Sequence, residues 1–193
     1  MIYVVSGYMR TGTSMIMRAL ESGGLDACYK QSQDEMKNRF ADEHYDPNIG
    51  GLYELERKDY REPEFPRKFD GKLIKSLNQG VPKMAVMPDG IRVVFMRRDI
   101  EEIRRSYFAF FGNHLNLGKE FVVNMEITKE TILNRKDVIS FHEFWYREVV
   151  ERPLEHFEIL RDAGWPIDPV LAAEIVDPQY CRFRLENLTI GII

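Results

Sequence analysis

The first 24 residues contain the pattern that most constrains how this chain can fold. Residues 2–5 are apolar and β-branched, as is typical of a buried parallel strand. A turn bounded by Gly7 and Gly12 follows, and then a segment with apolar residues on one helical face, which ends at Gly23 and Gly24. Because the N–H groups and the positive dipole end of such a helix point into the preceding loop, this arrangement predicts an anion-binding cradle.

The loop differs from the nucleotide P-loop at one informative position. Residues 7–14 follow Gly-x4-Gly-Thr-Ser, whereas the P-loop has Gly-x4-Gly-Lys followed by Ser or Thr. Thr13 stands in place of the lysine, and the positive charge lies inside the loop at Arg10. The lysine that bridges terminal phosphates is absent, so the pattern favours an anion with less charge than a triphosphate. A strand–turn–helix corner without a ligand is the alternative interpretation.

Composition narrows the class of protein. The chain has 193 residues and a net charge of −4, which favours one domain, residues 1–193, with no global positive field for nucleic acid or anionic lipid. No apolar run approaches the ~20 residues that a membrane span needs, so we expect a cytoplasmic protein with no membrane partner. Cys28 and Cys181 are expected as free thiols, and the four histidines fall in no metal-ligand spacing, so no metal site is expected.

Two further strands and a helix are predicted in the middle of the chain. Residues 72–77 and 91–96 have the apolar, β-branched character of strands, and the second is followed at once by Arg97 and Arg98. Helical spacing starts at residue 100 and ends at Gly112. A capping-box pattern predicts a short helix over residues 33–41, and residues 113–136 are expected to be a connecting segment with a helical turn after residue 128.

The C-terminal third is predicted to be helical. Asp137 can N-cap an amphipathic helix whose apolar positions include Phe141 and Val149. Pro153 either kinks this helix or starts a second one, and Asp168 followed by proline starts a last, short helix. Strands alternating with helices predict a three-layer α/β/α P-loop domain with a mostly parallel sheet.

A second possible phosphate site follows the strand at residues 91–96. Arg98 lies at the carboxyl end of this strand, and Ser106 lies eight residues further on, in the predicted helix. Ligands of doubly wound sheets bind at this edge, so a guanidinium and a hydroxyl there indicate an anion site. Pairing of Arg98 with Glu101 or Glu102 is the alternative.

Four segments together resemble the sulfotransferase family. Residues 8–14, Tyr-Met-Arg-Thr-Gly-Thr-Ser, resemble its 5′-phosphosulfate loop, and residues 93–107 resemble its 3′-phosphate segment, with an arginine after a strand and a serine eight positions later. Residues 72–76, Lys-Leu-Ile-Lys-Ser, look like the strand that carries a catalytic lysine in cytosolic members. Residues 48–54, Asn-Ile-Gly-Gly-Leu-Tyr-Glu, are similar to a segment of small bacterial sulfotransferase-like proteins.

The resemblance implies a donor, 3′-phosphoadenosine 5′-phosphosulfate, with 3′,5′-ADP as product and no metal. The 5′ side would be held by Arg10, Thr11, Gly12, Thr13 and Ser14, and the 3′-phosphate by Arg98 and Ser106. The reaction would be in-line transfer of a sulfuryl group to a hydroxyl or amine of a small-molecule or glycan acceptor. Arg10 and Lys75 would neutralise the charge that develops on the leaving group.

The chain departs from the family at two places. Leu77 stands where many cytosolic members have a histidine base, so the base would have to be another residue, and Glu54, Glu35 and His44 are the candidates. Glu35 also fits a structural role in the capping box. The C-terminal donor-binding segment of larger members is absent, and Arg182 could substitute for it.

Two other functions stay open from sequence. One is a divergent P-loop nucleotide or small-molecule kinase, against which Thr13 counts. The other is a non-catalytic P-loop domain that binds a nucleotide, which Leu77 keeps open.

Overall fold

A computed structural model of the chain describes residues 1–29, 53, 55, 62–77 and 80–181. These residues form one five-stranded sheet in which every strand pairs in parallel with its neighbours, in the order β2-β3-β1-β4-β5. The strands are β1 (Ile2–Gly7), β2 (Asp26–Ala27), β3 (Lys72–Leu77), β4 (Ile91–Arg97) and β5 (Val138–Trp145). β1 is the central strand, and it is buried along almost its whole length.

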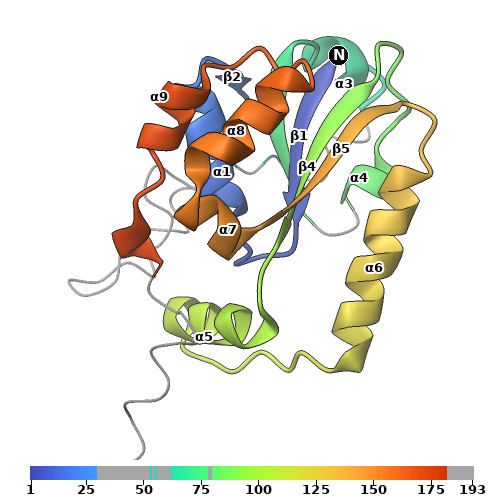
Figure 1. The fold of residues 1–193 in the computed structure, drawn as a ribbon. Coiled ribbons are helices and arrows are strands. Elements are labelled where there is room, and N and C mark those ends of the chain that lie inside the picture. Colours follow the sequence, from blue (N-terminus) through green and yellow to red (C-terminus); the bar gives the residue numbers. More distant parts are fainter. Residues whose placement is uncertain (30–52, 54, 56–61, 78–79, 182–193) are drawn as a thin grey trace, which may run out of the picture.

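Helices cover both faces of the sheet and make three layers (Figure 1). One face packs against α1 (Thr13–Ser22), α7 (Tyr146–Glu151), α8 (Pro153–Asp162) and α9 (Pro169–Glu174). The other face lies on the side of α3 (Phe65–Lys68), α4 (Gly80–Lys83) and α6 (Lys119–Leu133). α5 (Ile100–Phe111) lies beyond the end of β4, and a 3-10 turn, η3, covers Pro178–Tyr180. The predicted three-layer α/β/α class is therefore confirmed.

Each strand contributes side chains alternately to the two layers. In β1, Val5 packs toward α1 whereas Ile2 and Val4 pack toward the α6 side. In β4, Val94 packs toward α1 and Val93 packs toward the α6 side. Strands buried on both faces read as continuous apolar runs, which is why β1 and β4 could be located from sequence.

Several predicted boundaries are confirmed at their caps. The Asp99 side chain accepts from the backbone N–H groups of the first turn of α5, and Gly112 ends that helix with φ +69°. Asp168 accepts from Val170 N–H at 2.9 Å and starts α9. Pro153 begins α8, so the second of the two alternatives for this proline is the one observed.

The prediction for residues 137–151 was wrong. Residues 138–145 form the edge strand β5, paired with β4, and only residues 146–151 are helical. Asp137 does not cap a helix; its carboxylate accepts from Met87 N–H and from the guanidinium of Arg135. Pairing with β4 gives the β-branched and aromatic side chains of this segment a partly buried surface, and this tertiary contact outweighs the helical spacing.

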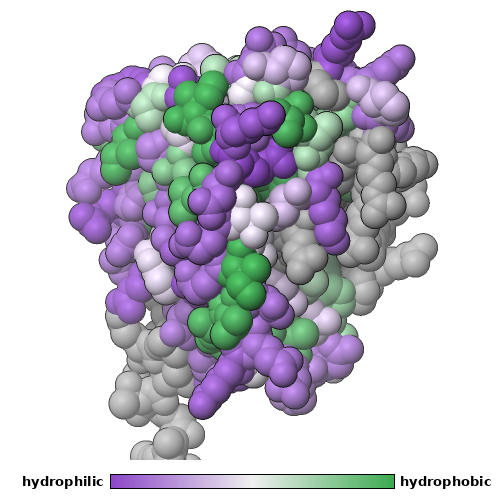
Figure 2. All heavy atoms as spheres, turned by 90° about the vertical axis from the view of Figure 1, so that its right-hand side faces the viewer, coloured by the Kyte–Doolittle hydropathy of each residue, from purple (hydrophilic) through white to green (hydrophobic). Residues whose placement is uncertain are grey.

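The prediction for residues 113–136 was wrong in part. Residues 113–118 connect two helices, but the helical turn expected after residue 128 is the end of the long helix α6, which begins at Lys119. Its apolar side chains do not lie on one face: Met125 and Ile132 are buried, whereas Val123 and Ile127 are more than half exposed. Figure 2 looks onto the side of the molecule that carries α6, where hydrophobic residues are scattered among hydrophilic ones. Apolar residues around the whole helix hide the periodicity on which the sequence prediction relied.

Candidate functional site

The predicted anion loop lies at the carboxyl edge of the sheet, where β1, β3 and β4 end. Residues 8–12 connect β1 to α1, and Arg10 and Gly12 both have left-handed backbone conformations, with φ of +67° and +95°. The Thr11 hydroxyl donates to the Tyr8 carbonyl at 2.7 Å, which closes the turn. The first turn of α1, whose N–H groups have no partner inside the helix, follows directly. The strand, loop and helix of a P-loop are therefore present.

Gly12 allows an aromatic ring to pack against the loop. A Cβ on this glycine would lie 2.3 Å from Cδ2 of Tyr146, far inside contact distance. Tyr146 is the first residue of α7 and is buried. Burial raises the pKa of its hydroxyl to about 12, so the ring is neutral at physiological pH. A residue from the C-terminal third thus fixes the loop.

Lys75 places a cation beside the loop. It lies on β3, its residue is only 3% exposed, and its Nζ donates to Oγ of Ser14 at 3.1 Å. Ser14 lies in the first turn of α1, directly after the threonine that replaces the P-loop lysine. A lysine from the neighbouring strand therefore reaches the part of the loop where the sequence pattern lacks one.

Arg10 reaches across the loop to α5. Its Nε donates to Oγ of the buried Ser106 at 2.9 Å, and its guanidinium carbon lies 4.7 Å from the ring centre of Phe110. A hydrogen bond and a cation–π contact hold the guanidinium in one place. The structure thus brings together two of the predicted binding residues, Arg10 and Ser106.

Arg98 contacts the loop backbone and a carboxylate at the same time. Its Nη1 donates to the carbonyl oxygen of Arg10 at 3.2 Å, and its Nε pairs with Oε2 of Glu102 at 2.9 Å. Arg98 and Glu102 are both buried, and the guanidinium carbon lies 4.2 Å from the ring centre of Tyr146. The alternative interpretation, in which Arg98 pairs with Glu102, is confirmed, and the pair also supports the strained backbone at Arg10.

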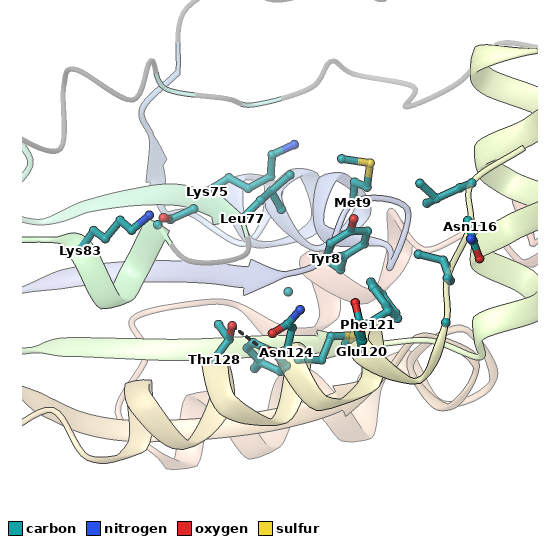
Figure 3. A pocket seen from close by; sticks show the side chains of 18 of the residues that line it. Tyr8, Met9, Lys75, Leu77, Lys83, Asn116, Glu120, Phe121, Asn124 and Thr128 are labelled. Atoms are coloured by element: carbon teal, nitrogen blue, oxygen red, sulfur yellow. Dashed lines mark hydrogen bonds between the residues drawn. The ribbon is translucent and has the colours of Figure 1, made fainter. Parts of the chain in front are cut away.

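A pocket of about 1120 Å³ opens beside the loop on the α4 and α6 side of the sheet (Figure 3). Tyr8 and Met9 of the loop line it, and so does Lys75. The opposite wall comes from residues 115–121 and from α6, including Asn124. Tyr8 packs edge-on against Phe121 with ring centres 4.4 Å apart, so the loop and α6 meet at this pocket. Burial, and then the nearby Tyr107, raise the pKa of Tyr8, which keeps its phenol protonated.

Four predicted site residues lie outside the described residues. These are the candidate bases Glu35, His44 and Glu54, and Arg182, the candidate C-terminal donor contact. Their roles stay predictions. Within the described range, the only carboxylate that lines the pocket is Glu120.

Sequence reasoning missed two parts of the site. One is the aromatic support of the loop by Tyr146, which has no local sequence signal because it lies far along the chain. The other is the wall contributed by α6, whose helix was not predicted. The i, i+4 spacing of Arg98 and Glu102 was a usable signal for their pairing.

Neither a metal cluster nor a membrane span is found in the described part of the chain. No three or more His, Cys, Asp or Glu side chains gather there as a metal site would need. Asp99, the acid that follows β4, has its carboxylate engaged with backbone N–H groups of α5. None of the described helices is both long and apolar enough to span a bilayer. Cys28 and Cys181 are not joined by a disulfide, as predicted.

Comparisons with known proteins do not assign a family. The chain matches no family model and no curated protein. Among solved structures, it is similar to an unliganded sugar kinase from Janibacter sp. HTCC2649, with 15% identity and a TM-score of 0.46 over 88% of this chain and 96% of the kinase chain. A likeness at this level carries neither family nor activity.

Proposed function

We propose that this protein transfers a sulfuryl group from 3′-phosphoadenosine 5′-phosphosulfate to a hydroxyl or amine group of an acceptor. The observation that carries the proposal is the buried Lys75 beside Ser14, together with Arg10 bound to Ser106. Lys75 and Arg10 thus place two positive charges at the loop, although neither stands at the usual lysine position, which is Thr13. The resemblance of the loop and of residues 93–107 to sulfotransferases points to the same donor.

The residues present fit this donor chemically. Thr11, Thr13 and Ser14 carry hydroxyls in the loop and the first turn of α1, and Gly12 leaves room for the Tyr146 ring that packs on the loop. When bound, the donor supplies a sulfuryl group: the bond from sulfur to the 5′-phosphate oxygen breaks while the bond to the acceptor atom forms. Lys75 and Arg10 would stabilise the negative charge left on that oxygen.

The acceptor would enter through the pocket beside α6. Tyr8, Met9 and Lys75 belong to both the loop region and the pocket lining, so an acceptor there would face the loop. The acceptor's proton must pass to a base as the new bond forms. Glu54 and Glu35 stay the candidates for that base.

A nucleotide comparison by calorimetry and thermal shift tests the proposal. 3′,5′-ADP at 100 times its Kd should raise the free energy of unfolding by about 2.7 kcal/mol, and 5′-ADP at the same concentration should raise it by less. Sulfuryl transfer is then measured with labelled donor over a panel of phenols, sugars and amines. Stabilisation by ATP with magnesium alone, and none by 3′,5′-ADP, would refute the proposal.

One observation favours a second candidate, a divergent P-loop kinase. The Arg98 guanidinium already pairs with the buried Glu102, which lowers the positive charge available to a 3′-phosphate. A nucleotide without that phosphate would not need it. The Glu102→Gln variant separates the two candidates: it should tighten 3′,5′-ADP more than 5′-ADP if the 3′-phosphate lies near Arg98, and change both equally if it does not.

A further inference from the structure

Among the described residues, the charged side chains that line the pocket are mostly positive, although the chain as a whole carries a net charge of −4. This part of the lining has three lysines and one carboxylate: Lys75, Lys83, Lys119 and Glu120. Lys75 is engaged with Ser14 at the loop. Lys119 and Glu120, at the start of α6, add one charge of each sign to the opposite wall.

Lys83 is the remaining lysine of the described lining. It ends the short helix α4, and no ion pair or hydrogen bond joins its Nζ to another described residue. Figure 3 shows Lys83 and Lys75 on the β3 and α4 side of the pocket, with Glu120, Phe121 and Asn124 on the α6 side. The two lysines thus lie along one wall, and only one of them is at the loop.

The surface between these groups is somewhat more apolar than polar. Residues of both walls contribute aromatic and aliphatic surface: Tyr8, Leu77, Phe95, Leu117, Phe121 and Met125. At about 1120 Å³ the pocket is slightly larger than the usual range for small-molecule sites. Such a volume suits a body of two or more rings, or an equivalent chain, better than a single small metabolite.

We infer that the acceptor of the proposed transfer is an anionic molecule with an apolar body, its carboxylate or equivalent acidic group bound by Lys83 and its hydroxyl or amine directed at the loop beside Lys75. This inference rests on the proposed function for the reaction and on the pocket for the acceptor. A charge-assisted bond to Lys83 would orient the long axis of the acceptor. The apolar walls would supply most of its burial.

Matched probes test the charge requirement. The dissociation constants of 4′-hydroxybiphenyl-4-carboxylate and of the neutral 4-phenylphenol are measured by calorimetry with 3′,5′-ADP present and absent. The carboxylate should bind at least tenfold more tightly. Lys83→Gln should remove this preference and leave the neutral probe unchanged, whereas Lys136→Gln, an exposed lysine outside the pocket lining, should preserve it.

The outcomes separate this inference from the proposed function. If 3′,5′-ADP binds but the two probes bind equally, or if the carboxylate does not bind up to millimolar concentration, the inference is overturned and the proposed function stands. If 3′,5′-ADP fails to bind while Lys83 still selects the carboxylate, the proposed function is overturned and the anion preference of the pocket stands. An equal effect of Lys83→Gln on both probes would also overturn the inference.

Discussion

The loop side and the pocket side of this site are built in different ways. On the loop side, Lys75, Arg98 and Ser106 are buried, and each is bonded to another part of the site. On the pocket side, Lys83, Asn116 and Glu120 are exposed and open toward the space they line. These contacts hold the loop in one shape, which would lower the ordering cost of binding the proposed nucleotide. On the open side, a few exposed side chains would select the proposed acceptor.

The largest effect is expected from removing the contacts of Arg98 with Glu102 and with the Arg10 carbonyl on the loop side. Arg98→Met leaves the Glu102 carboxylate buried without its partner, so we expect a loss of about 3–5 kcal/mol in the free energy of unfolding, measured in urea. The double variant Arg98→Met/Glu102→Gln should recover most of it. Arg161→Met, which removes only exposed ion pairs, should cost less than about 1 kcal/mol. An Arg98→Met protein as stable as the parent would show that these contacts of Arg98 do not stabilise the fold.

The next effect concerns rate. Lys75→Met keeps the apolar length of the side chain but removes the charge at the loop, so we expect turnover to fall by about 10²–10³-fold. Lys72→Met is the matched control, because Lys72 lies on the same strand but pairs with Asp26 at the surface. Initial rates at saturating donor and acceptor, together with melting temperatures, provide the measurement. Equal rates for the two variants would rule out Lys75 as a catalytic group.

Gly12 tests whether the loop depends on the distant Tyr146. Gly12→Ala combines a left-handed backbone with a Cβ only 2.3 Å from the Tyr146 ring, and we expect a loss of about 2–3 kcal/mol and weaker nucleotide binding. Gly24→Ala has a similar positive φ of +110° but no atom within 4 Å, so it should cost only about 1 kcal/mol. Equal losses in chemical denaturation would mean that the ring contact contributes nothing.

The smallest effect concerns the anchoring of α4, the helix that ends at Lys83. Arg135 donates to the Val81 and Met84 carbonyls and pairs with Asp137, so this pair ties α4 to the start of β5. Burial alone would raise the pKa of Asp137, but the hydrogen bonds from Arg135 and from Met87 N–H outweigh it, and the pKa is lowered. We expect Asp137→Asn to cost about 1.5 kcal/mol at pH 7.

The pH dependence of this cost has a definite sign. A lowered carboxylate pKa stabilises the fold above the ordinary value near 3.8, and the contribution is lost as pH falls through the lower, folded value. The difference between parent and Asp137→Asn should therefore shrink in urea titrations at pH 3. Nucleotide affinity should not change. A variant that loses nucleotide binding instead would show that the two sides are coupled.

The loop side could be predicted from sequence because its signals are local in the chain. Strand β1, the glycines of the loop and α1 follow one another within 24 residues. Arg98 directly follows β4, and Ser106 lies in α5, the next helix. Their contacts to Arg10 could not be predicted, because they depend on how two segments some 90 residues apart approach each other.

The pocket side could not be predicted, for two physical reasons. The apolar residues of α6 surround the helix, so no amphipathic period marks it. In β5, Phe141 and Trp145 have helical spacing by coincidence, and only the pairing with β4 decides in favour of a strand. Both errors concern elements whose conformation is set by neighbours rather than by local preference.

The packing of Tyr146 against Gly12 also has a consequence for the order in which the protein matures. The loop leaves the ribosome before the ring that supports it, because Tyr146 follows Gly12 by more than 130 residues. A nascent chain that stops before residue 146 would have the glycine-rich segment without its support. The proposed nucleotide would then stabilise only chains that include residue 146.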